Sequence, residues 1–183
     1  AYRTVAEGMN GHPVTIRTFD LGADKHVEGL DGLARVAPNP ALGLRAVRFC
    51  LAEPRLFLTQ LRAILRAAAF GRVSLLIPML AHASEIRQTL SLLDHARAQL
   101  DNQGIAYGDI LVGAMIEIPA AALTLKTFLK YFDFLSIGTN DLTQFLFAAD
   151  RANPKLAERY DWLSPSILRF LKRVLASLAG HKV

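Results

Sequence analysis

The chain has 183 residues, of which 52% are hydrophobic and 20% are charged, and its formal net charge is +5. This balance indicates a folded domain with a sizeable core and excludes an intrinsically disordered chain. No apolar run approaches the roughly 18 residues needed to cross a bilayer, and the first residues lack the apolar centre of a signal peptide, so we expect a cytoplasmic protein.

The distribution of charge narrows the possible partners, and the single cysteine narrows the possible disulfide and metal chemistry. The basic residues are dispersed along expected helices, with no run of like charge and no alternation with aromatic residues. Solvated helix faces explain them best, a preference for anionic ligands is the second interpretation, and we expect no nucleic-acid or membrane partner. Cys50 excludes an internal disulfide and a cysteine-rich metal site, and its helical apolar surroundings predict a buried, unreactive thiol.

Helical and extended patterns alternate through the first half of the chain. The β-branched run Val14–Thr18 predicts a strand that carries Arg17 and Asp20 to its carboxyl end. A long loop follows, and loops of this length in compact domains are usually functional. The elements expected here are a helix tail over 1–8, the strand, the loop over Gly22–Pro40, and helices over Gly43–Ala52 and from Pro54 to about Phe70.

The second half continues the alternation, with strands that are mostly apolar. The strand that ends at Ile116 places Glu117 at its carboxyl end. The expected elements are strands over Val73–Ile77, Ile110–Ile116 and Phe134–Ile137, a helix capped by Ser84 and running to about Gln103, a helix starting at Pro119, a helix from about Leu142 to Ala149, and a helix capped by Ser164-Pro165 and running to about Leu178.

The stretch FLSIGTNDLTQFLFAADRAN, residues 134–153, combines a buried strand with the polar residues that follow it. Gly138 ends the strand, and Thr139-Asn140-Asp141 supply candidate caps for the next helix. A carboxamide beside a carboxylate suits a hard cation and its oxygen ligands, and Arg151 is placed to bind an anion. The alternative is that the asparagine and aspartate only cap the helix, since both residue types favour that position.

Four strands, each followed by a helical pattern, predict a parallel α/β fold. Polar residues come directly after the strands, and the carboxyl ends of parallel strands meet at one edge of a sheet, so we expect one composite site there, as in a (β/α) barrel. Because a closed barrel needs eight strands, the chain supplies about half a barrel. The polar residues at that edge are Arg17, Asp20, Glu117, Asn140 and Asp141.

Seven stretches of the chain resemble the phosphoenolpyruvate-binding domain of enzyme I of the bacterial phosphotransferase system. They are RTFDLGADK (17–25), NPALGLRAVR (39–48), RAILRAAAFG (62–71), IPM (77–79), GAMIEIPAA (113–121), SIGTNDLTQ (136–144) and ADRAN (149–153). The similarity runs nearly end to end with similar spacing. The amino-acid sequence SIGTNDLTQ favours the enzyme I branch over the related pyruvate phosphate dikinases, phosphoenolpyruvate synthases and multiphosphoryl transfer proteins.

The resemblance implies a (β/α)₈ barrel that dimerises and binds phosphoenolpyruvate with Mg²⁺. It implies Glu117 and Asp141 as the magnesium ligands. The implied substrate ligands are Arg17 and Arg151 for the phosphate and carboxylate, Asn140 and the Asp141 backbone for the rest of the cradle, and Arg45 as a weaker candidate for the phosphate. The physical chemistry agrees, because Mg²⁺ usually takes one or two carboxylates plus substrate oxygens, and the arginine fork suits both ends of this anion.

The chain also departs from the family pattern. Because Ala1 is not a Met, we expect a piece of a longer protein, with residues 1–183 forming a partial barrel domain. The resemblance implies that two strands before this piece and two after it are missing. In the family these missing strands carry a further substrate arginine and the cysteine that protonates the enolate. Cys50 does not replace that cysteine, because Cys50 lies in a different motif. Ala23 stands where the family usually has a second glycine. Because alanine is less flexible than glycine, this change stiffens the loop slightly.

The histidines give no sign of a phosphorylation site. The resemblance implies that the phosphorylated histidine lies in a separate N-terminal domain. None of the histidines of this chain has the family's sequence context: His12, His26, His82, His95 and His181. His82 follows a strand and could approach the site, but a surface or hydrogen-bonded histidine is the simpler interpretation. We therefore expect no catalytic residue in this chain, and no turnover by the chain alone.

Two functions of different classes stay open at this point. The first is a phosphotransferase piece that binds phosphoenolpyruvate, after which the phosphoryl group passes to a histidine and then to a phosphocarrier protein of the sugar phosphotransferase system. The second is a non-catalytic phosphoenolpyruvate-binding or interaction module, and the chain could also derive from a related multiphosphoryl transfer protein or a dikinase-like enzyme. Retention of Arg17, Glu117, Asp141 and Arg151 together favours the first.

Four apolar strands from an eight-strand barrel leave two unpaired sheet edges and an uncovered inner face. Such edges pair with other chains, and large exposed apolar patches usually mark interfaces. We therefore expect the chain, at this length, to persist only by self-association or by remaining joined to a missing half.

Overall fold

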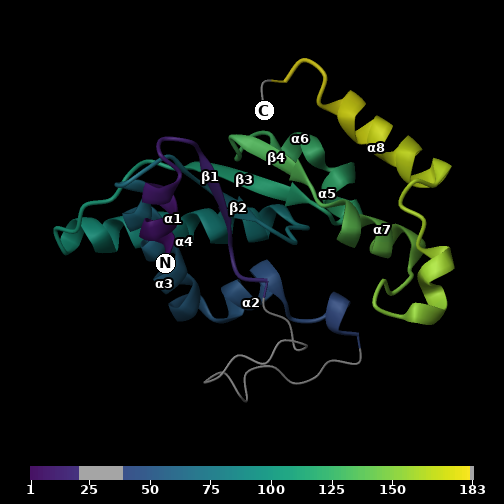
Figure 1. Cartoon of the computed structure of the whole chain (residues 1–183), viewed down its shortest axis with the longest axis horizontal. Helices are drawn as coiled ribbons and strands as arrows, with labels where there is room; N and C mark the ends of the chain where they lie inside the picture. Colours follow the sequence, from purple (N-terminus) through teal and green to yellow (C-terminus); the bar gives the residue numbers. More distant parts are fainter. Residues whose placement is uncertain (21–38, 182–183) are drawn as a thin grey trace.

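Four parallel strands form the centre of the computed structural model, which describes residues 1–20 and 39–181 (Figure 1). They are β1 (Val14–Arg17), β2 (Val73–Ile77), β3 (Leu111–Ile116) and β4 (Phe134–Ile137), and they pair in the order β1-β2-β3-β4. The predicted parallel α/β fold with four strand–helix units is therefore confirmed. Within the described residues the strands form a partial, barrel-like sheet that is not closed.

The helices follow the strands in the expected alternation. Figure 1 shows α1, α3 and α4 gathered on one side of the sheet and α8 well away from them, and α8 packs against α6. The helical segments are α1 (Tyr2–Gly8), η1 (Pro40–Leu42), α2 (Ala46–Ala52), α3 (Pro54–Ala68), α4 (Ala83–Asn102), α5 (Pro119–Leu123), α6 (Leu125–Phe128), α7 (Thr139–Phe147), η2 (Pro154–Arg159) and α8 (Pro165–Ser177).

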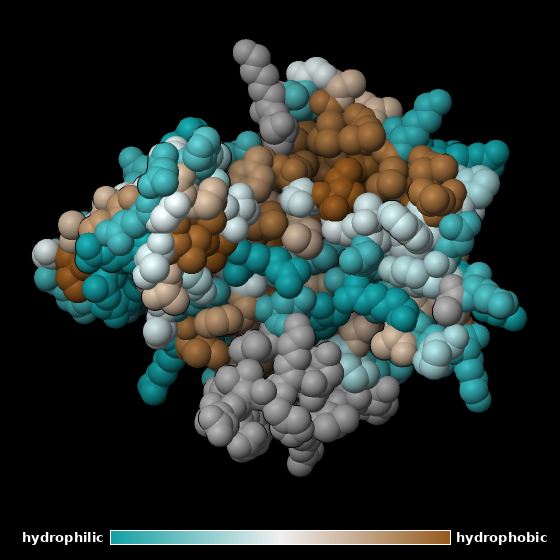
Figure 2. All heavy atoms as spheres, in the orientation of Figure 1, coloured by the Kyte–Doolittle hydropathy of each residue, from teal (hydrophilic) through white to brown (hydrophobic). Residues whose placement is uncertain are grey.

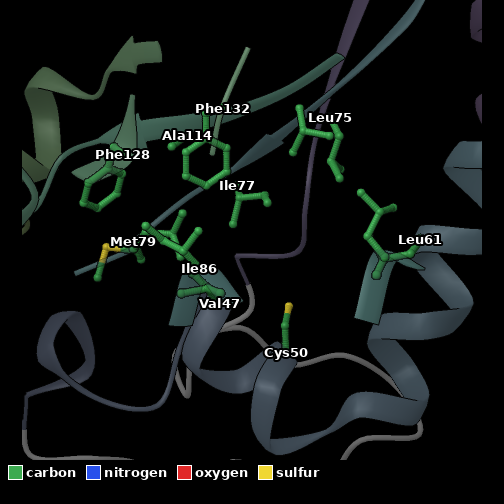
Figure 3. Packing of buried hydrophobic residues seen from close by; sticks show 14 of the residues in the cluster. Val47, Cys50, Leu61, Leu75, Ile77, Met79, Ile86, Ala114, Phe128 and Phe132 are labelled. Carbon is green, nitrogen blue, oxygen red and sulfur yellow. The ribbon is translucent and has the colours of Figure 1, made fainter. Parts of the chain in front are cut away.

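The core lies between the sheet and the helices that cover it. Figure 3 shows Leu75 and Ile77 of β2 reaching toward Leu61 of α3 and Ile86 of α4, and all four side chains are fully buried. Burial of each such side chain contributes roughly 1.5–3 kcal/mol. This packing holds β2 in the middle of the layer and fixes where the carboxyl ends of the strands emerge.

The start of α7 differs from the prediction. The helix begins at Thr139 and not near Leu142, and the Leu142 N–H donates to the Gly138 carbonyl at 3.1 Å. Thr139-Asn140-Asp141 are therefore its first turn and not its caps, so the expectation of capping residues was wrong. Asparagine and aspartate favour caps because of their side chains, but here the strand ends early enough for Gly138 to take that position. The first turn still favours the Asp141 carboxylate, because it lies at the positive end of the helix dipole.

Two other helix starts also differ from the prediction. Ser84 does not cap α4: the Glu85 carboxylate accepts hydrogen bonds from the N–H groups of Ala81 and His82, at 2.7 and 3.0 Å, and the helix starts at Ala83. The helix expected from Gly43 starts only at Ala46, which leaves Arg45 in an extended conformation. By contrast, the Ser164 hydroxyl does accept from the Ile167 N–H at 3.4 Å, as its capping role requires.

Cys50 is buried, as predicted, and its thiol lies 3.9 Å from the Phe19 carbonyl, to which it donates. Burial, followed by the charge of Asp20, raises the pKa of the Cys50 thiol to about 12. The thiolate, which is the reactive form, is thus scarce at neutral pH, so the prediction of an unreactive thiol is supported.

The remaining predictions concern histidines and the long loop. His12, His82, His95 and His181 are exposed, as the simpler interpretation of His82 expected. His26 and the functional loop expected over Gly22–Pro40, with Ala23, lie outside the described residues except for Asn39 and Pro40. Of the helices in the described ranges, none has the length and apolar character required to cross a membrane.

Candidate functional site

The polar residues that follow the strands meet at the carboxyl edge of the sheet. Arg17 ends β1, and Glu117 comes directly after β3. Asp141 lies in the first turn of α7, which follows β4. Ion pairs join several of these side chains, and they bring in Arg45 from the residue before α2 and Arg151 from beyond α7. The charged side chains expected at this edge therefore lie together in one cluster.

Arg45 lies at the centre of this cluster. Its Nε and Nη2 atoms donate to the two carboxylate oxygens of Asp20, at 3.0 and 2.7 Å, and its Nη1 donates to Asp141 Oδ1 at 3.4 Å. The three side chains are between 6% and 11% exposed. Burial lowers the pKa of Arg45, but the hydrogen bonds to Asp20 and the nearby carboxylates outweigh this, so the pKa is raised. Arg45 therefore stays charged and links two buried carboxylates.

Arg17 and Arg151 flank this central group from opposite ends. Arg17 Nη2 lies 3.7 Å from Asp20 Oδ2, and Arg151 Nη1 lies 3.7 Å from Asp141 Oδ1. Their side chains are 44% and 41% exposed, so both guanidinium groups reach solvent. A soluble anion therefore has access to two arginines that each lie beside a carboxylate.

Glu117 is the most deeply buried carboxylate of the group, at 2% exposure. Its Oε1 accepts a hydrogen bond from the Met79 N–H at 2.7 Å. Burial raises the pKa of Glu117 to about 7, and the negative charges of Asp141 and Asp20 act in the same direction. The Met79 hydrogen bond and the charge of Arg17 act against this. Burial, more than the neighbouring charges, therefore disfavours the carboxylate form of Glu117.

Two backbone features hold Glu117 in this place. Met79 has a φ of +62°, a conformation that a non-glycine residue rarely adopts and that is typical of functional sites. Gly138 lies on the other side, where a Cβ atom would come within 2.6 Å of Glu117 Oε2 and 2.8 Å of Glu117 Cβ. The absence of a side chain at Gly138 is thus what allows the turn before α7 to lie directly against this carboxylate.

The carboxylates fit a hard cation that completes its shell with other oxygens. Glu117 and Asp141 are both buried, and the negative charge of Asp141 contributes to the raised pKa of Glu117. Among residues 1–20 and 39–181, no group of three or more His, Cys, Asp or Glu side chains is arranged to hold a metal ion. A pair of carboxylates, with the remaining positions left to ligand oxygens and water, is the donor set that Mg²⁺ usually takes in proteins.

The sequence-predicted residues thus fall into two groups. The first group is connected by ion pairs through Asp20 and Asp141, or by the effect of neighbouring charges on Glu117, and comprises Arg17, Arg45, Glu117, Asp141 and Arg151. Asn140 lies beside Asp141 on the same helical turn with an exposed side chain, and its backbone carbonyl accepts a hydrogen bond from the Tyr160 hydroxyl. The backbone role of Asp141 in binding substrate stays a prediction.

Sequence reasoning assigned no site role to several residues that shape this edge: Asp20, Met79, Gly138, Gln144 and Tyr160. Asp20 is expected at the edge from its position after a strand, but the sequence does not indicate that it pairs with Arg45. Met79 and Gly138 stand inside the IPM and SIGTNDLTQ stretches, so their place in a motif was a usable signal. Tyr160 lies in an irregular, polar stretch that gives no signal.

The whole chain, residues 1–183, matches the protein family described as "PEP-utilising enzyme, PEP-binding domain". It is 57% identical over 186 residues to the phosphoenolpyruvate-protein phosphotransferase of Cupriavidus necator, covering 100% of this chain and 32% of that protein. The proteins of the same name from Geobacillus stearothermophilus and Staphylococcus carnosus are 47% and 44% identical, over 100% and 96% of this chain and 31% and 30% of their own length. The chain thus spans about a third of the length of these relatives. A solved citrate lyase from Burkholderia xenovorans aligns with 68% of this chain and 38% of its own, with 21% identity and a TM-score of 0.49.

Proposed function

The chain belongs to the PEP-binding domain family of PEP-utilising enzymes, and from this premise we propose that it binds phosphoenolpyruvate together with Mg²⁺ as part of a phosphoenolpyruvate-protein phosphotransferase. The observation that carries the proposal is the cluster in which Arg45 joins Asp20 to Asp141 while Arg17 and Arg151 stand 3.7 Å from the same two carboxylates. It offers several guanidinium groups to a ligand with a phosphate at one end and a carboxylate at the other.

The arginines divide the binding of that anion. Arg17 and Arg151 are partly exposed, so they are the groups that first meet phosphoenolpyruvate and bind its phosphate and its carboxylate. Arg45 is a further candidate for the phosphate. Asp20 accepts from its Nε and Nη2, and Asp141 accepts from its Nη1, so a bound phosphate would share this guanidinium group with both carboxylates. Asn140 completes the cradle from the first turn of α7.

Glu117 and Asp141 are the residues that would hold the metal. Bound there, Mg²⁺ supplies positive charge that offsets the negative charge of the transferring phosphoryl group and of the departing enolate. The protein's own part is to keep Glu117 oriented through the Met79 N–H and to keep both carboxylates out of bulk water. The burial of both carboxylates, and the effect of the Asp141 charge on Glu117, support a divalent cation as the ligand.

We extend the proposal to the reaction for which the relatives, the phosphoenolpyruvate-protein phosphotransferases, are named. The bond between phosphorus and the enol oxygen of phosphoenolpyruvate breaks, a histidine nitrogen takes the phosphoryl group, and the enolate takes a proton to give pyruvate. In this proposal the histidine and the proton donor lie outside the described residues. The phosphoryl group then passes to a phosphocarrier protein of the sugar phosphotransferase system, in the cytoplasm. None of the residues 1–20 and 39–181 is proposed as catalytic.

Calorimetric titration of phosphoenolpyruvate into the intact protein tests the binding function. We expect saturable binding in the presence of Mg²⁺ and a large loss of affinity in EDTA, because the carboxylates alone repel the ligand. Exchange of labelled pyruvate into phosphoenolpyruvate, measured on the same protein, separates a transferase from a non-catalytic binding module. Binding that is equally strong with and without Mg²⁺ would contradict the proposed metal site.

We also propose that the chain self-associates. β1 and β4 end the sheet within the described residues, and β4 is only half-buried although three of its four residues are apolar. Figure 2 shows apolar surface gathered in the part of the molecule where Figure 1 places β4 and α6. The exposed large apolar residues of the C-terminal half are Leu111, Leu123, Tyr131, Trp162, Leu163, Leu168 and Leu175. An exposed area of this kind is typical of an interface.

Light scattering on the purified chain measures this directly. We expect a molar mass of at least twice the 20.1 kDa of one chain, because pairing of two copies would cover the edge strand and the apolar surface. A monomer with a single cooperative thermal transition would show that the edge is stable in water and that the proposed association is wrong.

A further inference from the structure

The segment between α7 and α8 carries Arg151 and is attached to α7 at both of its ends. At the first end, Ala148 takes a left-handed conformation with a φ of +50°, which turns the chain back. The Gln144 side-chain oxygen then accepts the Arg151 N–H at 3.0 Å. At the second end, the Tyr160 hydroxyl donates to the backbone carbonyl of Asn140. The segment therefore closes on the same helical turn that presents Asp141.

The attachments leave Arg151 held beside the first turn of α7. The Arg151 N–H donates to Gln144, its Nη1 lies 3.7 Å from Asp141 Oδ1, and Tyr160 holds the far end of the segment on Asn140, next to Asp141. Burial raises the pKa of the Tyr160 hydroxyl, the charge of Arg151 acts against this rise, and the charge of Asp141 adds to it. The segment that carries Arg151 is therefore tied to α7 at Arg151 itself and again at Tyr160.

We propose that Tyr160 is a positioning residue, which holds Arg151 over the first turn of α7 and through it sets the affinity for the anionic substrate. The inference rests on the proposed function, because it takes phosphoenolpyruvate as the anion. It goes beyond that function, because neither the motifs nor the charge cluster assigns a role to the segment around Tyr160.

The physical reason is the mobility of Arg151 without this contact. Its side chain is 41% exposed, and its 3.7 Å separation from Asp141 is too long for a strong hydrogen bond. Ordering a long, exposed side chain costs conformational entropy, which a ligand must offset when it binds. By fixing the far end of the segment on α7, the Tyr160 hydroxyl restricts the positions open to Arg151 before the ligand arrives. Removing the hydroxyl therefore weakens binding of the anion without removing any charge.

The test compares two tyrosine variants of the intact protein. Tyr160→Phe removes only the hydroxyl and its hydrogen bond to the Asn140 carbonyl, and we expect phosphoenolpyruvate to bind about 5-fold more weakly in Mg²⁺, the loss expected for one hydrogen bond between neutral groups. Tyr107→Phe is the matched control, because the Tyr107 hydroxyl donates to Asp101 at 3.3 Å in the connection between α4 and β3, far from the carboxyl edge. We expect the control to bind like the parent, and equal affinities in all three proteins would overturn the proposal.

A double-mutant cycle separates positioning from a general structural effect. If Tyr160 acts through Arg151, the Tyr160→Phe change should have little further effect on affinity in an Arg151→Met background. Additive losses in the double variant would mean that Tyr160 does not act through Arg151, and the proposal would then be wrong.

Proteolysis without ligand distinguishes failure of this inference from failure of the proposed function. Trypsin cleaves after arginine, and a released segment exposes the bond between Arg151 and Ala152. We expect faster cleavage there in Tyr160→Phe than in the parent and in Tyr107→Phe. Equal cleavage overturns the positioning role whether or not phosphoenolpyruvate binds. Faster cleavage in a protein that binds no phosphoenolpyruvate would support the attachment and overturn the choice of substrate.

Discussion

Replacing Glu117 with glutamine is expected to lower the Mg²⁺-dependent affinity for phosphoenolpyruvate by on the order of 100-fold or more, since loss of residues that only support a metal ligand already costs about 10–100-fold. The amide has the same shape, and its oxygen can still accept the Met79 N–H that now bonds Glu117 Oε1 at 2.7 Å. The fold should therefore remain intact. Because burial of the carboxylate is costly, as its raised pKa of about 7 indicates, we expect unchanged or slightly greater stability.

Calorimetry and urea denaturation on the same samples measure both parts of this prediction. Glu85→Gln is the matched control, because the Glu85 carboxylate also accepts backbone N–H groups, from Ala81 and His82, but at the start of α4. We expect this control to bind like the parent. If Glu117→Gln binds phosphoenolpyruvate in Mg²⁺ as tightly as the parent does, Glu117 is not a ligand of the proposed metal site.

Replacing Gly138 with alanine is expected to damage both stability and binding. The added Cβ would lie 2.6 Å from Glu117 Oε2, 2.8 Å from Glu117 Cβ and 3.0 Å from Met115 Sδ. Real Cβ atoms do not approach other atoms this closely, so either the turn before α7 or the Glu117 side chain has to move. Overpacking of this kind costs roughly 1–3 kcal/mol of unfolding free energy. Movement of Glu117 would also separate it from Asp141, so Mg²⁺-dependent binding should be lost.

Gly8 offers a matched control for this substitution. A Cβ at Gly8 meets no atom within 4 Å. Gly8 is the last residue of α1, which precedes β1 and contributes no residue to the charge cluster. Because alanine favours helices more than glycine, Gly8→Ala should leave stability unchanged or raise it by up to about 1 kcal/mol. Urea denaturation of both variants measures this. A Gly138→Ala protein with the parent's stability and affinity would show that the contact between this turn and Glu117 does not matter.

The strands could be predicted closely because their signals are local. β2 and β4 have the bounds expected from sequence, Val73–Ile77 and Phe134–Ile137, since apolar runs ended by proline and glycine leave little choice. The start of α7 could not be predicted in this way. Asparagine and aspartate favour the capping position, but in the structure Gly138, which comes earlier, takes it. Glu117 was found because it stands directly after a strand.

The pairing of the site residues was beyond sequence reasoning. Arg45 contacts Asp20 across 25 residues and Asp141 across 96 residues, so the contact depends on how α2 lies beside the sheet. Arg45 was named only by its motif, and its central place in the cluster follows from the fold. Tyr160 reaches back 20 residues to Asn140 from an irregular segment, and no periodicity or composition marks such a residue in advance.

The most direct test of the account is a crystal structure of the intact protein with phosphoenolpyruvate and Mn²⁺, which prefers the same oxygen ligands as Mg²⁺ and can be located by anomalous scattering. We predict one anomalous peak bound to the carboxylates of Glu117 and Asp141, with the phosphate and carboxylate of the ligand against Arg17 and Arg151. A metal ion bound elsewhere, or a ligand that leaves both arginines without contact, would contradict the account.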